Sequence, residues 1–246
     1  MLRLPRNDMV TLRGIPNQVG VFPNFEFIRA LKKALEIDQG TIFRYHNHEN
    51  TILNVIFSQL IDSNEVDKNE LCNFIRSITH SKAENHVGER DMVDLYQLVI
   101  GGFYHPSMKG SNSIKSVLPA VIQSSDFLKN KYSNACYGTE AITSLNLKNH
   151  TWLLKDNEDK WINPYKTLPA VFEKVNSEQL DALCEENGEE LRDGGAAMMA
   201  YAKMQFSEMQ PDERNFYRNA LLRYCELDTL AMVMIYEGWK DYLINN

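Results

Sequence analysis

The 246-residue sequence predicts a helix-rich α/β protein. Three observations favour this class. Apolar residues recur at three- and four-residue spacing in several segments, which is typical of amphipathic helices. A short run of β-forming residues follows Gly40, and the resulting order of helix, strand and helix is that of an α/β layer. The composition, with 43% hydrophobic and 24% charged residues, is ordinary for a folded globular protein.

The first elements follow an irregular or extended lead-in that reaches to about Pro23. A helix is expected from Phe25, with Asn24 as its N-cap and Gly40 as its terminator. Residues 41–45 then form the expected strand, because threonine, isoleucine, phenylalanine and tyrosine gather there.

Two more helices are expected before residue 81. The first places on one face the apolar residues Ile52, Leu53, Ile56, Phe57 and Leu60. The second covers about 68–80 and directs inward Leu71, Phe74, Ile75 and Ile78. The next apolar segment, 92–104, is broken by Gly101 and Gly102, and its periodicity fits either a strand or a helix.

The middle of the chain is predicted to be a loop, a helix and then an irregular insertion. The loop holds Pro106 and Gly110, and the helical face begins at Ile114, with Pro119 interrupting it or starting a new helix. An insertion covers about 124–169 and contains a β-hairpin at 151–161 with an Asp/Asn-rich turn. Because no repeat or low-complexity linker divides the chain, residues 1–246 are interpreted as a single domain.

The C-terminal part is predicted to be helical. Small residues after Asp193 allow close helix packing, and a long helix starts at Pro211 with acids in its first turn and no breaker before Gly238. Its buried side is expected to carry Phe216, Leu221, Leu227, Leu230, Met234 and Tyr236.

Charge and cysteine usage narrow the classes of function. A net charge of −7 and a pI near 5.4 argue against a passive nucleic-acid coat, so any nucleic-acid contact must use a local basic patch. The four cysteines are scattered, which suits neither a zinc ribbon nor a disulfide framework and favours a reducing compartment: Cys72, Cys136, Cys184 and Cys225. No stretch approaches the ~20 apolar residues of a membrane helix, so a cytoplasmic protein without a membrane partner is expected.

Tyr224 and Asp228 stand four residues apart on the last helix and therefore share a face. A carboxylate beside a buried face is costly unless it is paired or binds a metal ion. For an isolated pair of this spacing, an aspartate that pairs with an arginine or an amide is the simpler interpretation.

Three motifs alter this interpretation when they are taken together: MVDLY, YHP-x-x-KGSNSIK-x-VLPA and YC-x-x-DT-x-AMV. As a set they resemble the bacterial domain-of-unknown-function family 2779, a predicted DnaQ-like (DEDD) 3′–5′ exonuclease branch of the ribonuclease H-like superfamily. The resemblance covers most of the chain, from about Phe25 onward. It implies a partial ribonuclease H-like fold and a metal-dependent nuclease that hydrolyses nucleic-acid phosphodiesters.

The resemblance also implies roles for individual residues. Asp228 would match the last metal-binding aspartate, and Tyr224 the residue that orients the attacking water. Glu49 would match the acidic residue that follows the family's second motif, and Asp94, in MVDLY, the Asp-Leu that comes next; both are predicted catalytic residues and, with Asp228, metal ligands. Mg²⁺ or Mn²⁺ is the implied cofactor, because such ions prefer hard oxygen ligands and support in-line displacement at phosphorus.

The KGSNSIK loop is the predicted substrate-binding segment, through Lys109, Ser111, Asn112 and Lys115. Backbone amides at the start of the following helix would hold a phosphate, with the lysines adding positive charge. The alternative is a loop that ends in an N-cap serine.

One departure from the family pattern limits the expected activity. The family begins with Asp-x-Glu on a leading strand, whereas Asp8 is the only acid among the first 24 residues. The chain is therefore expected to be a part of a longer or split nuclease that needs an N-terminal companion segment. The alternative is a catalytically inactive remnant that binds nucleic acid or acts as a scaffold.

A zinc site at HNHEN is a third, less favoured hypothesis. His46 and His48 alternate on the predicted strand and would share a face, as two zinc-binding histidines do, but a third ligand at a recognisable spacing is missing.

Overall fold

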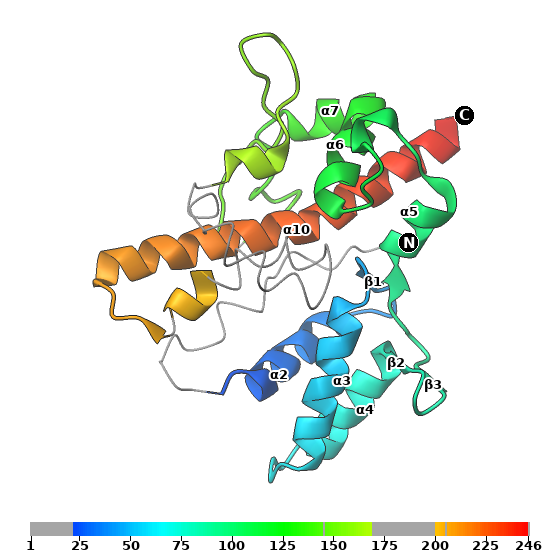
Figure 1. The fold of residues 1–246 in the computed structure, drawn as a ribbon, viewed down its shortest axis with the longest axis vertical. Helices are drawn as coiled ribbons and strands as arrows, with labels where there is room; N and C mark the ends of the chain where they lie inside the picture. The colour runs from blue at the N-terminus through cyan, green and yellow to red at the C-terminus, as the bar shows by residue number, and fades with distance from the viewer. Residues whose placement is uncertain (1–21, 145, 169–199, 205, 246) are drawn as a thin grey trace. The chain divides into compact units, whose positions relative to one another are not determined.

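A computed structural model describes residues 22–144, 146–168, 200–204 and 206–245. The chain divides into two compact units, the first ending at Tyr104 and the second beginning at His105 (Figure 1). The described residues are mainly helical with two small two-stranded sheets, which confirms the helix-rich α/β class. The ribonuclease H-like topology and the single-domain organisation stay predictions.

The first unit contains four helices and four two-residue strands among its described residues. In chain order they are α2 Asn24–Leu35, β1 Phe43–Arg44, α3 His48–Ile61, α4 Lys68–Ile78, β2 His80–Ser81, β3 His86–Val87, β4 Val93–Asp94 and α5 Leu95–Gly102. Strand β1 is parallel to β4, with Arg44 opposite Asp94. Strand β2 is antiparallel to β3, with His80 opposite Val87.

The core of the first unit lies between α2, α3 and α4, which pack side by side (Figure 1). Its buried side chains come from the predicted apolar faces and include Ile28, Leu53, Ile56, Leu60, Leu71, Phe74, Ile75 and Ile78. The inward face of α4 is confirmed in full. On α3 the prediction for Ile52 is wrong, since this side chain is 41% exposed. Asn50, a polar residue of the same helix, is buried.

Three local predictions for the first unit need correction. Asn24 is the first residue of α2 and not its N-cap; Pro23 occupies the cap position, and Asn24 Nδ2 donates to Gln59 Oε1 at 2.8 Å. The helix ends at Leu35, before Gly40, so Gly40 is not its terminator. The strand predicted over 41–45 is reduced to Phe43–Arg44.

The ambiguous segment 92–104 forms both structures in succession. Val93–Asp94 is a strand and Leu95–Gly102 a helix, and the change occurs at Asp94. The Asp94 side chain accepts a hydrogen bond from Tyr96 N at 3.0 Å, so it is the N-cap that starts the helix.

The second unit is organised around one long helix. Its elements are η1 Pro106–Met108, α6 Ile114–Ser124, α7 Asp126–Tyr132, η2 Pro164–Thr167 and α10 Pro211–Asn245, and a further helical stretch covers 200–204. Helices α6 and α7 pack along α10 (Figure 1). Leu221, Leu227, Leu230 and Met234 are buried as predicted, but Phe216 is 54% exposed and α10 continues through Gly238. The predictions for 193–199 and for Cys184 lie outside the described residues.

Pro119 lies inside α6, and the structure compensates for it. A proline has no N–H to donate to the carbonyl four residues earlier, which here is that of Lys115. Asn163 Nδ2 donates to this carbonyl oxygen at 3.3 Å. The proline therefore neither ends the helix nor starts a new one. It leaves the Lys115 carbonyl oxygen available to Asn163, which attaches the segment around Asn163 to α6.

The stretch 124–169 is less irregular than predicted. It contains α7 and η2, and it contributes to the core the buried side chains Tyr132, Tyr137, Trp152 and Leu153. The hairpin within 151–161 is confirmed by an antiparallel bridge between Lys155 and Trp161.

Carboxylates on α10 hold this stretch in place. Glu226 is fully buried and accepts hydrogen bonds from Tyr137 Oη at 2.9 Å, from Asn146 Nδ2 at 2.8 Å and from Ser144 Oγ. Glu237 pairs with Lys131 Nζ at 2.7 Å. Because a buried carboxylate is tolerated only when donors surround it, these contacts specify where the segment lies.

None of the helices in the part of the chain that the structure describes is long and apolar enough to cross a membrane.

Replacing Glu226 with alanine is expected to destabilise the second unit by roughly 3 kcal/mol, since the buried Tyr137 hydroxyl and the half-buried Ser144 and Asn146 side chains lose their acceptor. Urea unfolding followed by circular dichroism measures the change. Glu213→Ala on the exposed first turn of α10 is the matched control and should leave the midpoint nearly unchanged. Equal midpoints for the two variants would contradict this account of Glu226.

Gly138→Ala is expected to destabilise far more than Gly110→Ala. Both glycines have a positive φ, +74° and +83°, so each substitution strains the backbone by about 1–2 kcal/mol. A Cβ at Gly138 would also lie 2.2 Å from the carbonyl oxygen of Leu147, whereas none of the described atoms lies within 4 Å at Gly110. The same unfolding measurement compares the two, and similar losses would show that the close approach at Gly138 is unimportant.

Candidate functional site

Tyr224 and Asp228 lie one turn apart on α10, and both contact Tyr165 of η2. The Tyr165 hydroxyl donates to Asp228 Oδ1 at 2.7 Å. The rings of Tyr165 and Tyr224 meet edge to face, with centroids 6.4 Å apart. The shared face predicted from the spacing of Tyr224 and Asp228 thus contacts one side chain of a distant segment.

Lys115, in the first turn of α6, completes this cluster. Its Nζ lies 5.3 Å from the ring centroid of Tyr224 and 5.7 Å from that of Tyr165, within the range of cation–π attraction. Three predicted site residues, Lys115, Tyr224 and Asp228, therefore converge. With Tyr165 they form what is called here the α10 cluster.

Tyr165 was not predicted, and its position depends on Asn163. Asn163 Oδ1 accepts from Tyr165 N at 3.1 Å and so caps η2, while its Nδ2 donates to the Lys115 carbonyl freed by Pro119. An Asn-Pro dipeptide is a sequence signal for such a capped turn, but it does not reveal the partner of Tyr165.

The remaining predicted substrate residues lie in the loop before α6. Lys109 adopts a left-handed conformation, with φ of 52°, after η1. Ser111 Oγ accepts from Ser113 N at 3.3 Å, and Ser113 Oγ accepts from Lys115 N at 3.4 Å, so Ser113 is the N-cap of α6. The N-cap serine of the alternative interpretation is therefore present. The backbone amides of Ser113 and Lys115 donate within the protein, so a phosphate bound to this loop would have to use the lysine side chains. Phosphate binding by the loop stays a prediction, as does a role for Asn112.

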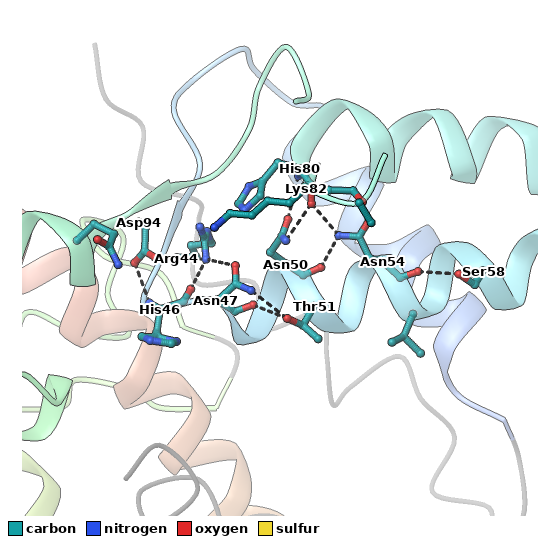
Figure 2. Close-up of a pocket in the computed structure, with 14 residues that line it drawn as sticks. Arg44, His46, Asn47, Asn50, Thr51, Asn54, Ser58, His80, Lys82 and Asp94 are labelled. Atoms are coloured by element: carbon teal, nitrogen blue, oxygen red, sulfur yellow. Dashed lines mark hydrogen bonds and ion pairs between the residues drawn. The ribbon is translucent and has the colours of Figure 1, made fainter. Parts of the chain in front are cut away.

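Asp94, in the first unit, is bound tightly by its neighbours (Figure 2). Its Oδ1 accepts from His46 N at 2.8 Å and from Tyr96 N at 3.0 Å, and its Oδ2 lies 3.3 Å from Arg44 Nη1. Arg44 is buried and also donates from Nη1 to Asn47 Oδ1 at 3.0 Å. These bonds join the end of β1 to the start of α5, which is a structural role for Asp94.

The histidine pair does not have the geometry expected of it. His46 has a left-handed φ of 68°, and its ring lies against Tyr96 with centroids 4.5 Å apart. His48 follows as the first residue of α3. The two histidines therefore do not alternate on a strand, and the shared-face argument for a zinc site is wrong.

The predicted metal ligands fall in different units. Glu49, exposed in the first turn of α3, and Asp94 belong to the first unit, and Asp228 to the second. Among the residues with described positions, no group of three or more histidine, cysteine, aspartate or glutamate side chains could hold a metal ion. Mg²⁺ and Mn²⁺ prefer several oxygen ligands. The α10 cluster, with one carboxylate beside two phenols and a lysine, does not fit such an ion by itself.

Cys225 lies next to this cluster in sequence, and its thiol is expected to be a poor nucleophile. Burial, and secondarily the negative charge of Asp228, raise the pKa of Cys225 to about 12. Burial also raises the pKa of Cys72 and of Cys136. A thiol of raised pKa is a poor nucleophile at neutral pH, so these cysteines are better explained as packing residues.

Comparison with known proteins supports part of the family resemblance. Residues 7–113 match the model of the family described as "Domain of unknown function (DUF2779)". No curated protein and no solved structure matches the chain. The match includes MVDLY and most of the KGSNSIK loop, and it starts earlier than the predicted Phe25. It ends before α10, so the Tyr224 and Asp228 motif lies beyond the matched residues.

Cys225 is expected to resist alkylation in the folded protein. At pH 8 a thiol of pKa about 12 is deprotonated roughly 1,000-fold less than one of pKa about 9. Iodoacetamide labelling followed by peptide mass spectrometry should show Cys225 unmodified in buffer and modified in urea, and the native rate should rise with pH. Equal labelling rates in buffer and urea would contradict its burial.

Proposed function

We propose that this chain is part of a metal-dependent, 3′–5′ exonuclease-like enzyme that hydrolyses nucleic-acid phosphodiesters, and that it requires a companion segment for activity. The observation that carries the proposal is the convergence of Lys115, Tyr224 and Asp228 in the α10 cluster. Residues 7–113 match the domain-of-unknown-function family from whose resemblance the proposal started.

Each member of the cluster has a role that suits this chemistry. Lys115 is the cation that would attract a phosphate, and its ammonium lies within cation–π range of two aromatic rings. Tyr224 would orient the water that attacks phosphorus. Asp228, oriented by the Tyr165 hydroxyl, supplies the one carboxylate of the site. The companion segment would contribute the Asp-x-Glu carboxylates, which with Asp228 would make a ligand set for Mg²⁺ or Mn²⁺.

A second candidate is a catalytically inactive nucleic-acid-binding or scaffolding protein. One observation in its favour is that the described residues contain no group of three potential metal ligands. The ion pair of Asp94 with Arg44 points the same way. Nucleic acid is the proposed partner of the nuclease and of the nucleic-acid-binding form of the second candidate, and the cytoplasm is the proposed location of both candidates.

The deciding experiment measures hydrolysis of 5′-labelled single-stranded DNA and RNA in Mn²⁺ or Mg²⁺. The chain is assayed alone and together with a segment, encoded next to it, that contains Asp-x-Glu. Shortening of the strand from its 3′ end is expected only for the mixture. Asp228→Asn should lower the rate by at least about 100-fold and Tyr224→Phe by about tenfold. Glu213→Gln, on the exposed first turn of the same helix, is the control.

Two results would overturn the nuclease proposal. The first is an unchanged rate in Asp228→Asn. The second is strand binding without hydrolysis under every condition, which would instead favour the inactive candidate.

A further inference from the structure

The first unit contains a polar pocket of about 890 Å³ that the proposed hydrolysis does not use (Figure 2). One wall is α3, and the other is the segment that begins at β2. Arg44, His46 and Asp94 line one end, and the lining continues along α3 to Ser58. This volume is in the range of small-molecule and cofactor sites.

The α3 wall is a stripe of uncharged polar side chains. Asn47, Thr51, Asn54 and Ser58 recur at spacings of four, three and four residues, which places them on one face of the helix. The amide and hydroxyl groups of these side chains already donate within the protein, to Asn47, Asn50, Asn54, Thr51 and His80. What they offer a ligand is oxygen acceptors, so such a wall suits a ligand edge that donates hydrogen bonds. Val55 and Ala83 are the apolar side chains of the lining, and apolar surface makes up much of the wall, so the pocket suits a ligand that has both polar and apolar faces.

His80, at the opposite wall, is held in place by hydrogen bonds with three side chains, those of Asn50, Asn54 and Asp91. Asn50 is buried, and it accepts from His80 N at 2.9 Å and donates to His80 O at 3.0 Å. Asn54 Nδ2 donates to the same oxygen at 3.1 Å. The carboxylate of Asp91 lies 2.9 Å and 3.0 Å from His80 Nδ1.

This arrangement fixes both the backbone and the ring of His80. Because Asp91 occupies Nδ1, the nitrogen left for a ligand is Nε2, which has no partner among the residues the structure describes. The buried Asn50 side chain forms hydrogen bonds with both the backbone N and the backbone O of His80, and a backbone fixed in this way is typical of a preorganised site.

The charge left over in the pocket is positive. Asp94 is its one carboxylate, and the ion pair with Arg44 neutralises it. Lys82 lines the pocket and has no ion-pair partner in the described ranges, since nearby Glu84 pairs with Arg76. Asp91 adds a negative charge behind the ring of His80, so the preference for an anion rests on the exposed ammonium of Lys82 among the lining side chains.

We infer that this pocket binds a phosphate-bearing nucleotide. Lys82 Nζ and His80 Nε2 would bind the phosphate, and the amides and hydroxyls of α3 the sugar and base. The ligand is either a free mononucleotide or the phosphorylated end of a strand, since both offer the same chemistry. The inference is independent of hydrolysis at the α10 cluster and stands whether or not the chain cleaves nucleic acid.

Isothermal titration calorimetry of the whole chain tests the inference, with AMP, adenosine, inorganic phosphate and a 5′-phosphorylated dinucleotide as probes. AMP is expected to bind at least tenfold more tightly than adenosine or phosphate. Lys82→Ala should weaken AMP about tenfold, the usual effect of losing one charge-assisted hydrogen bond, and should leave adenosine unchanged. His80→Gln should also weaken AMP, because it removes Nε2 while the backbone bonds to Asn50 remain.

Lys33→Ala is the matched control, since this lysine is also exposed in the first unit but lies on α2 outside the pocket. Asp228→Asn should leave AMP binding unchanged, which separates this inference from the nuclease proposal. Tighter binding of the dinucleotide would identify a strand end as the ligand, and equal binding a free nucleotide.

Three results would overturn the inference. They are no AMP binding at millimolar concentration, equal affinity for AMP and adenosine, and equal losses in Lys82→Ala and Lys33→Ala. Because Lys82 is exposed, its substitution tests the ligand contact without unfolding the chain.

Discussion

The buried carboxylate of Glu226 is the constraint on which the second unit depends. A charge without exposure to water is stable only when donors replace its hydration, and here Tyr137, Ser144 and Asn146 do so. These donors belong to a stretch with little regular structure, so their hydrogen bonds define its path. Glu237, eleven residues later and thus three turns along the same face of α10, extends the attachment to α7.

Asp228 serves another face of the same helix. Two residues on a helix are about 200° apart, so Asp228 points away from Glu226 and meets η2 instead. Helix α10 therefore orders the chain on both sides through carboxylates. The aspartate that the family resemblance marks as catalytic is one of several acidic residues with a positioning role. A functional aspartate on this helix would combine both roles, because its orientation already depends on Tyr165.

Local patterns in the sequence predicted what local interactions determine. The inward faces of α4 and α10 were predicted because their apolar residues follow the helical period over several turns. Helix α7 was missed because seven residues are too few to display that period. The two-residue strands depend on distant partners, and the left-handed turn at His46 is stabilised by Asp94, 48 residues away. The residues near β1 and His46 in the sequence give no indication of either the strand pairing or the bond to Asp94.

The same distinction applies to the candidate site. The spacing of Tyr224 and Asp228 is local and was predicted, whereas Tyr165 lies 63 residues from Asp228 in sequence and was not. In the first unit, Asp94 was predicted as a metal ligand from a motif, but the structure pairs it with Arg44. An ion at that position would have to displace a buried guanidinium, which itself needs Asp94 for neutralisation. The two residues proposed to bind a phosphate in that unit, His80 and Lys82, belong to no motif that a sequence pattern could mark.

The acidity of the chain determines how either unit can meet a phosphate. With a net charge of −7, the average field repels anions, so long-range steering cannot provide the affinity. Binding would have to come from short contacts with individual lysines, such as Lys115 beside two tyrosines or Lys82, which lines the same pocket as His80. Contact with only one or two phosphates releases few counterions, and the affinity then depends weakly on salt. The proposed sites would therefore recognise a particular phosphate and its surroundings, in contrast to a coat protein that binds any strand through its charge.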